Sequence, residues 1–141
     1  MVATVKVNAS RVDAALRARA LVMGRRAGKL LVDEARRGVS RRTGELAESI
    51  KADSPRVSGD RVVVHVHVDA EHGVYQEEGT GIYGPTGTPI RARSGGVLRF
   101  DWPAAGGIVF ARSVRGSPPT KFWSKALRRW PQIIRRIAAG G

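Results

Sequence analysis

Apolar residues in the first third of the chain recur every three or four positions, which is the period of an α-helix. The series comprises Val12, Leu16, Ala20, Met23, Ala27, Leu30, Leu31 and Ala35. Asn8 or Ser10 can cap this helix, because either side-chain oxygen accepts a hydrogen bond from a free backbone N–H. We therefore predict a long N-terminal helix over residues 8–38, in which Gly24 and Gly28 would let another chain approach closely.

The middle of the chain changes from the helical period to the alternation of a strand. Residues 61–68 read R-V-V-V-H-V-H-V, and this run of β-branched valines predicts a β-strand with His65 and His67 on its half-exposed face. A short helix is predicted before this strand, capped by Thr43, and another is predicted after it, over residues 70–78.

The last part of the chain begins with a long segment, residues 79–96, that is rich in Gly, Pro and Thr. A loop of this length within a domain is usually either functional or disordered until it meets a partner. Two strand-like runs, 97–102 and 107–114, then predict a hairpin. A basic helix over residues 120–137 closes the chain, and Pro131 must kink or interrupt it. The order of elements predicts an α+β fold: a small antiparallel sheet packed by the long N-terminal helix and the basic C-terminal helix.

Length and composition narrow the class of protein. The 141 residues predict a single domain over 1–141, with enough chain to bury a core. There is no cysteine, which excludes disulfides, cysteine-ligated metals and cysteine nucleophiles. No apolar run approaches the roughly 18 residues of a membrane span, and the first residues do not have the pattern of a signal peptide, so we expect no contact with membrane.

The formal charge is +13, and it is unevenly distributed. Residues 1–56 hold 13 basic and 6 acidic side chains, residues 57–90 hold 1 and 5, and residues 91–141 hold 11 and 1. A chain with an acidic middle and basic ends can bind copies of itself head to tail, and it can equally present its ends to DNA.

Five short motifs occur in an order that resembles a known family. They are T-G-x-L-x-x-S-I at residues 43–50, Y-Q-E-E-G-T at 75–80, the hairpin segments L-R-F at 98–100 and V-F-A-R at 109–112, and G-S-P-P at 116–119 followed by F-W and A-L within 122–127. Over residues 43–127 the chain resembles the small head–tail connection proteins, also called neck or tail-completion proteins, of long-tailed bacteriophages. The glycine-rich loop and the F-W pair, where F-L is commoner, depart from that pattern.

This resemblance implies a structural role without enzymatic activity. Such proteins form a homo-oligomeric ring, with six copies favoured, in the neck of the virion after assembly in the host cytoplasm. The expected partners are the neighbouring head connector or stopper proteins and the tail tube or terminator proteins, and no cofactor or metal is expected. The loop 79–96 is then a candidate arm that orders on a neighbouring subunit. The candidate subunit contacts are Glu77, Glu78, Tyr83, Arg91, Arg93, Arg112 and Arg115.

Enzymatic, metal-binding and nucleotide-binding interpretations have weak support in the sequence. Glu77 and Glu78 are adjacent, so their carboxylates point in different directions and do not form a general acid/base pair. His65 and His67 share a strand face with Asp69 and could ligate a metal, but a half-exposed face that tolerates imidazole is the commoner case. The loop after Glu78 lacks the Gly-Lys-Ser/Thr ending of a phosphate-binding loop.

A small basic nucleic-acid-binding protein is the main alternative. The cations of the C-terminal helix could contact phosphates, either as a dedicated site or as a loose lining for DNA that passes through a ring. Trp123 and Trp130 lie among them and could stack on bases, although Trp130 also has the spacing of a core residue. The candidate DNA-facing residues are Lys121, Lys125, Arg128, Arg129, Arg135 and Arg136.

Overall fold

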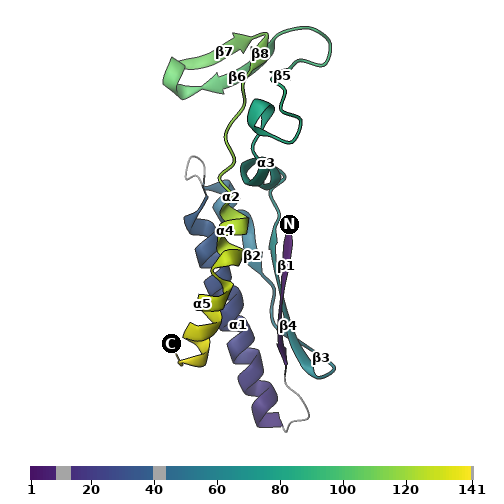
Figure 1. The fold of residues 1–141 in the computed structure, drawn as a ribbon, viewed down its shortest axis with the longest axis vertical. Coiled ribbons are helices and arrows are strands. Elements are labelled where there is room, and N and C mark those ends of the chain that lie inside the picture. Colours follow the sequence, from purple (N-terminus) through teal and green to yellow (C-terminus); the bar gives the residue numbers. More distant parts are fainter. Residues whose placement is uncertain (9–13, 40–43, 141) are drawn as a thin grey trace. The chain divides into compact units, whose positions relative to one another are not determined.

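The computed structural model describes residues 1–8, 14–39 and 44–140. They form two units: unit 1 comprises residues 1–73 and 121–141, and unit 2 is residues 74–120, inserted between the two parts of unit 1. Helices and small antiparallel sheets together make an α+β fold, as predicted (Figure 1). One domain is predicted from the sequence, and each unit is best described separately.

Unit 1 is built on an antiparallel sheet with the order β1-β4-β2. Its strands are β1 (Val2–Asn8), β2 (Ile50–Ala52) and β4 (Arg61–Val68), and β3 (Arg56–Ser58) also pairs with β4. The predicted strand 61–68 is confirmed at both ends. The N-terminal strand was not predicted, and Asn8 lies in it rather than at a helix cap. The alternation V-A-T-V-K-V suits a strand, and residues 2–8 pair with residues 61–67 of β4.

Helix α1 (Ala14–Arg37) covers one face of this sheet, which carries Val5, Val64 and Val66. The long helix is confirmed, with a start later than predicted; the other proposed cap, Ser10, lies outside the described residues. The glycines of α1 face β4: a Cβ on Gly24 would lie 3.1 Å from Val62, and one on Gly28 would lie 2.9 Å from Val64. The segment that approaches these glycines closely is therefore this chain's own strand, not another chain as predicted.

The C-terminal segment completes the core of unit 1. Helix α4 (Phe122–Arg128) buries Phe122 completely, and helix α5 (Trp130–Ala138) buries Ile133 and Ile137 against the same cluster as α1. Pro131 stands in the first turn of α5, where its missing N–H costs nothing, so the predicted basic helix is interrupted just before it. The short helix α2 (Glu45–Ser49) adds Leu46 to the core; its predicted cap at residue 43 lies outside the described residues.

Unit 2 contains short elements only. Helix α3 (His72–Glu78) leads into it and is followed by a 3₁₀ turn at Gly81–Tyr83. Strand β5 (Ile90–Arg91) pairs with β8 (Ser113–Val114), and β6 (Leu98–Trp102) pairs with β7 (Gly107–Ala111) across a 3₁₀ turn at Pro103–Ala105. The predicted hairpin is confirmed. The segment 79–96, predicted as a long loop, includes the turn and strand β5.

Candidate assembly interface

The base of unit 2 is a junction between two of the sequence motifs. The amide of Thr80 donates to the carbonyl of Ser117 at 2.9 Å, and the amide of Ser117 donates to Thr80 Oγ1 at 2.9 Å. The amide of Ile82 donates to the carbonyl of Arg115 at 2.8 Å. These bonds join the E-E-G-T motif to the G-S-P-P motif, although the motifs lie far apart in the chain.

Glycine is required where these two segments cross. Gly81 and Gly116 have φ of 63° and 91°, a region that side chains with a Cβ rarely adopt. A Cβ on Gly116 would overlap the carbonyl oxygen of Thr80, and a Cβ on Gly81 would overlap that of Arg115. The junction therefore depends on backbone approach that only glycine permits.

Beyond this junction lies a segment that we call the arm, residues 90–115, which contains β5, β6, β7 and β8. None of its described side chains is buried. The exposed fractions of Phe110, Val97 and Ile108 are 63%, 57% and 55%, and that of Trp102 is 50%. The register places Phe110 and Ile108 on one side of the β6–β7 hairpin and Trp102 on the other. Exposed apolar side chains gathered on one short segment make the arm a candidate surface for contact with another molecule.

The arginines predicted as subunit contacts lie on or next to the arm. Arg91 and Arg112 line an open hollow of about 690 Å³ together with the turn at Gly95 and Gly96. Arg93 and Arg115 are exposed as well. The structure thus brings Arg91 and Arg112 together, and all four guanidinium groups remain accessible.

The remaining predicted contacts differ in accessibility. Glu78 is exposed, and Tyr83 is 42% exposed. Glu77 is only 8% exposed and has an interaction of its own, so it is not a free surface carboxylate. Adjacent positions on α3 point to different surroundings, which separates the two glutamates that the sequence treats as a pair.

The predicted DNA-facing cations surround the ends of the C-terminal helices in unit 1. All six are exposed, and Arg129 is paired with Glu34 of α1 at 3.4 Å. The aromatic residues beside them pack in or against the core: Trp123 is 7% exposed, and Trp130 is half-buried against the core cluster. The cations are therefore available to an anion, whereas the two tryptophans do not form a platform for bases.

A second basic surface was not predicted as a site. Arg19, Arg25, Arg26 and Lys29 are exposed on α1, and Arg25 and Lys29 line a hollow beside the sheet edge at Lys51 and Asp53. The sequence could have indicated this basic surface, because residues at these positions fall outside the apolar series of the helix.

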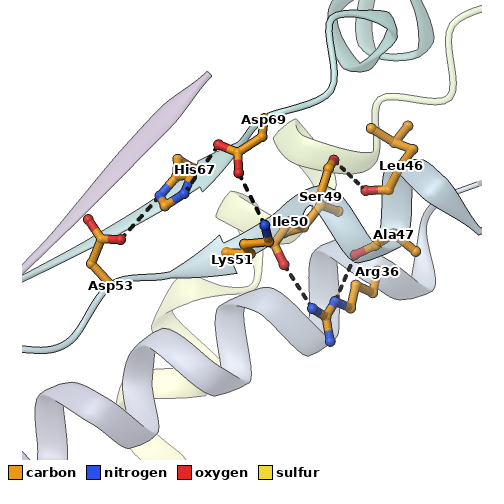
Figure 2. Close-up of polar contacts among 9 residues, drawn as sticks. All are labelled: Arg36, Leu46, Ala47, Ser49, Ile50, Lys51, Asp53, His67 and Asp69. Carbon is orange, nitrogen blue, oxygen red and sulfur yellow. Dashed lines mark hydrogen bonds and ion pairs between the residues drawn. The ribbon is translucent and has the colours of Figure 1, made fainter.

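The face of the sheet opposite α1, here called the open sheet face, carries polar groups that the sequence indicated only in part (Figure 2). His67 lies between two carboxylates, with Nδ1 at 3.7 Å from Asp53 and Nε2 at 3.3 Å from Asp69. Lys51 Nζ lies 3.4 Å from Asp69. His65 points toward Thr4, with 3.2 Å between Nδ1 and Oγ1. Among the described residues, no group of three or more His, Cys, Asp or Glu side chains is placed to hold a metal ion.

A separate contact in the same view fixes the edge of the sheet to α1. Arg36 Nε donates to the carbonyl of Ala47, and Arg36 Nη2 donates to that of Ile50, both at 2.9 Å. These bonds satisfy carbonyl groups at the end of α2 and the start of β2, so Arg36 has a structural role among the many cations of α1.

A basic α+β protein with this exposed arm has the character of an assembly component. Residues 5–79 match the model of the HK97-gp10-like family, described as "Bacteriophage HK97-gp10, putative tail-component". Since the match spans more than half of the 141 residues, the chain belongs to this family. It is a structural tail component of a bacteriophage, located in the virion, and its partners are other virion proteins.

The match covers the sheet of unit 1 from Val5 onward, together with α1, α2 and α3, and it ends where the junction begins. No curated protein and no solved structure matches the chain. Within the part of the chain that the structure describes, no helix is long and apolar enough to cross a bilayer.

Proposed function

We propose that this protein is a non-enzymatic neck protein that forms a homo-oligomeric ring, of six copies in the favoured case, between the capsid connector and the tail. The observation that carries the proposal is the arm: a tail component that exposes five large apolar side chains on one short segment needs a neighbour to cover them. The exposed candidates Glu78, Tyr83 and the arginines of the arm would then lie in subunit or partner contacts.

A ring requires a heterologous interface, in which one patch of each subunit meets a different patch of the next. Two segments of the chain differ in charge: residues 57–90 hold one basic and five acidic side chains, whereas the arm holds five arginines and one acidic residue. Charge complementarity between different patches favours correct register and fast association more than it favours affinity.

The test is electron microscopy of particles made by a phage that lacks this gene, with and without the protein supplied in trans. The proposed function predicts that full heads and complete tails accumulate separately without the protein and join when it is supplied. In joined particles, density for the protein should have the rotational symmetry of a ring in the neck. Joined particles without the protein would contradict the neck role.

The second candidate function is nucleic-acid binding, which is favoured by the exposed cations of α1, α4 and α5. A filter-binding series with increasing salt tests it, because an affinity that rests on phosphate contacts falls steeply as salt is added. Within a ring, the same cations would hold DNA loosely as it passes through the channel. Undetectable DNA binding at low salt would remove this candidate in both forms.

A further inference from the structure

Helices α4 and α5 lie along α1 within unit 1, and a groove separates their exposed side chains (Figure 1). The groove consists of two hollows of about 170 and 510 Å³. Both hollows are lined by Glu34, Arg37, Arg129 and Gln132, so they are continuous with each other. We call this feature the helix groove.

The helix groove has an excess of positive charge. Its lining contains five cations and only two carboxylates, those of Asp33 and Glu34. The two oxygens of Glu34 lie 3.1 Å from Arg37 and 3.4 Å from Arg129, so one acid holds a guanidinium group from each side of the groove. The other three cations, which pair with no acid among the described residues, are Lys125, Arg128 and Arg136.

The two exposed flanks of α4 and α5 differ in chemistry. The flank that lines the helix groove carries the cations, whereas Leu127 and Ile134, which are 40% and 42% exposed, do not line it. The apolar residues that do line the groove, such as Phe122 and Ile133, are buried. The centre of a protein–protein interface is depleted of charge and enriched in aromatic residues. The groove has the opposite composition, which favours a polyanion such as a phosphodiester backbone over a protein surface.

The same composition distinguishes double-stranded from single-stranded nucleic acid. Proteins that bind single strands stack the bases on exposed aromatic side chains. Trp123 and Trp130 are the aromatic residues nearest in sequence to the groove cations, and they pack in or against the core. Guanidinium groups bind phosphate oxygens in pairs of parallel hydrogen bonds, and phosphate contacts carry no base sequence.

We propose that the helix groove binds the phosphodiester backbone of double-stranded DNA, independently of base sequence, with Lys125, Arg128 and Arg136 as its phosphate contacts. The inference rests on the second candidate function, nucleic-acid binding, and it names the site and the chemical group bound there. Arg37 and Arg129 border the contact and are positioned by Glu34.

The other basic hollow of unit 1 is less suited to bind phosphates. It lies beside the sheet edge and includes Arg36 and Lys51 among its cations. Arg36 donates to two backbone carbonyl groups, and Lys51 pairs with Asp69. The exposed cations of α1 near this hollow therefore provide a comparison surface for the test.

The test compares two triple variants of the full chain that have the same net charge. The groove variant carries Lys125→Gln, Arg128→Gln and Arg136→Gln. The control variant carries Arg19→Gln, Arg25→Gln and Lys29→Gln on α1. Each variant loses two arginines and one lysine, and all six side chains are exposed, so circular dichroism should show that both variants fold normally.

Binding is measured by fluorescence anisotropy with a short labelled DNA duplex in a series of salt concentrations. The groove variant should bind at least about tenfold more weakly than the wild type at low salt. Its plot of log affinity against log salt should be less steep by about 2–3, because each lost phosphate contact removes about 0.9 from the slope. The control variant should change the slope by less than about 1. Duplexes of different sequence should bind alike.

The outcomes separate this inference from the proposals on which it rests. Equal weakening in the two variants would mean that net charge attracts DNA, which overturns the helix groove and leaves nucleic-acid binding intact. A wild-type chain that does not bind the duplex at low salt overturns both. Tighter binding of a single strand than of a duplex of the same length overturns the duplex as the occupant.

An acidic protein segment is the other class of polyanion, and polyglutamate serves as its probe. Polyglutamate that binds the wild type as tightly as the duplex does, and loses affinity in the groove variant alone, overturns DNA as the occupant. The neck role is decided independently by the particles described above.

Discussion

The two units of this protein are stabilised by different kinds of interaction. Unit 1 buries a contiguous cluster that draws on β1, β4, α1, α2, α4 and α5. Unit 2 has no buried apolar side chain among its described residues and relies on backbone hydrogen bonds and glycine turns at its base. The contrast teaches that one chain can combine a unit with a contiguous buried core and a unit whose apolar side chains stay accessible.

The two phenylalanines Phe122 and Phe110 give the largest test of this contrast. Phe122→Ala should lower the free energy of unfolding by about 3–5 kcal/mol, because its ring is fully buried in unit 1. Phe110→Ala in the arm should change it by no more than about 0.5 kcal/mol, because its ring is 63% exposed. Urea denaturation of both variants measures the difference, and equal losses would contradict the division between the units.

A substitution at Gly28 tests how tightly α1 packs on β4 in unit 1. Gly28→Ala should destabilise the protein by about 1–3 kcal/mol, since the new Cβ would lie 2.9 Å from a methyl group of Val64 and 3.3 Å from Ala52. The gain in helix propensity, about 1 kcal/mol, opposes this loss. A double-mutant cycle with Val64→Ala should show favourable coupling in the urea midpoint; additive effects would mean that α1 moves away from β4 easily.

A substitution at the junction of unit 2 tests whether a local loss of structure there also destabilises unit 1. Gly116→Ala should open the contact with Thr80, at a cost of about 1–3 kcal/mol for the strained backbone and more for the overlap. Hydrogen exchange should become faster at the amides of Thr80 and Ser117, with the amides of β4 unchanged. Gly95→Ala is the matched control, because it also has a positive φ, of 70°, but faces open space. Faster exchange throughout β4 would show that the units unfold together.

Ion pairs on the surface should contribute least to the free energy of unfolding. Lys51→Met removes the ion pair with Asp69, whose side chains are 59% and 53% exposed, and should change the free energy of unfolding by less than about 0.5 kcal/mol. The small effect should disappear in high salt, because exposed charges are screened. A loss above 1 kcal/mol that persists in salt would mean that the polar cluster of the open sheet face supports unit 1.

Most of the fold could be predicted from local patterns. The strand at residues 61–68 and the hairpin around Pro103 are set by β-branched residues and turn residues within a few positions, and the structure has both. The strand Val2–Asn8 was missed because Asn is a favoured helix cap and is uncommon in strands, so Asn8 indicated the start of a helix. Its pairing with residues some sixty positions away decides between them, and no local pattern reports that pairing.

The candidate interface could be predicted in composition but not in arrangement. The arginines of the arm and the cations of the C-terminal helices are exposed, as expected for charged residues in basic segments. The burial of Glu77 beside exposed Glu78 depends on tertiary packing, and so does the meeting of the E-E-G-T and G-S-P-P motifs. The role of Gly24 and Gly28 was misjudged for the same reason, since a close approach does not reveal which segment approaches.

Unit 2 leaves unit 1 after Gly73 and returns at Lys121, where Phe122 re-enters the core. Both ends of the insert therefore join unit 1, and no residue of the arm belongs to the core cluster. Mutation can rewrite residues 90–115 to suit a different neighbour while selection on folding acts elsewhere. A tail component built in this way can change what it binds while the residues of its core stay the same.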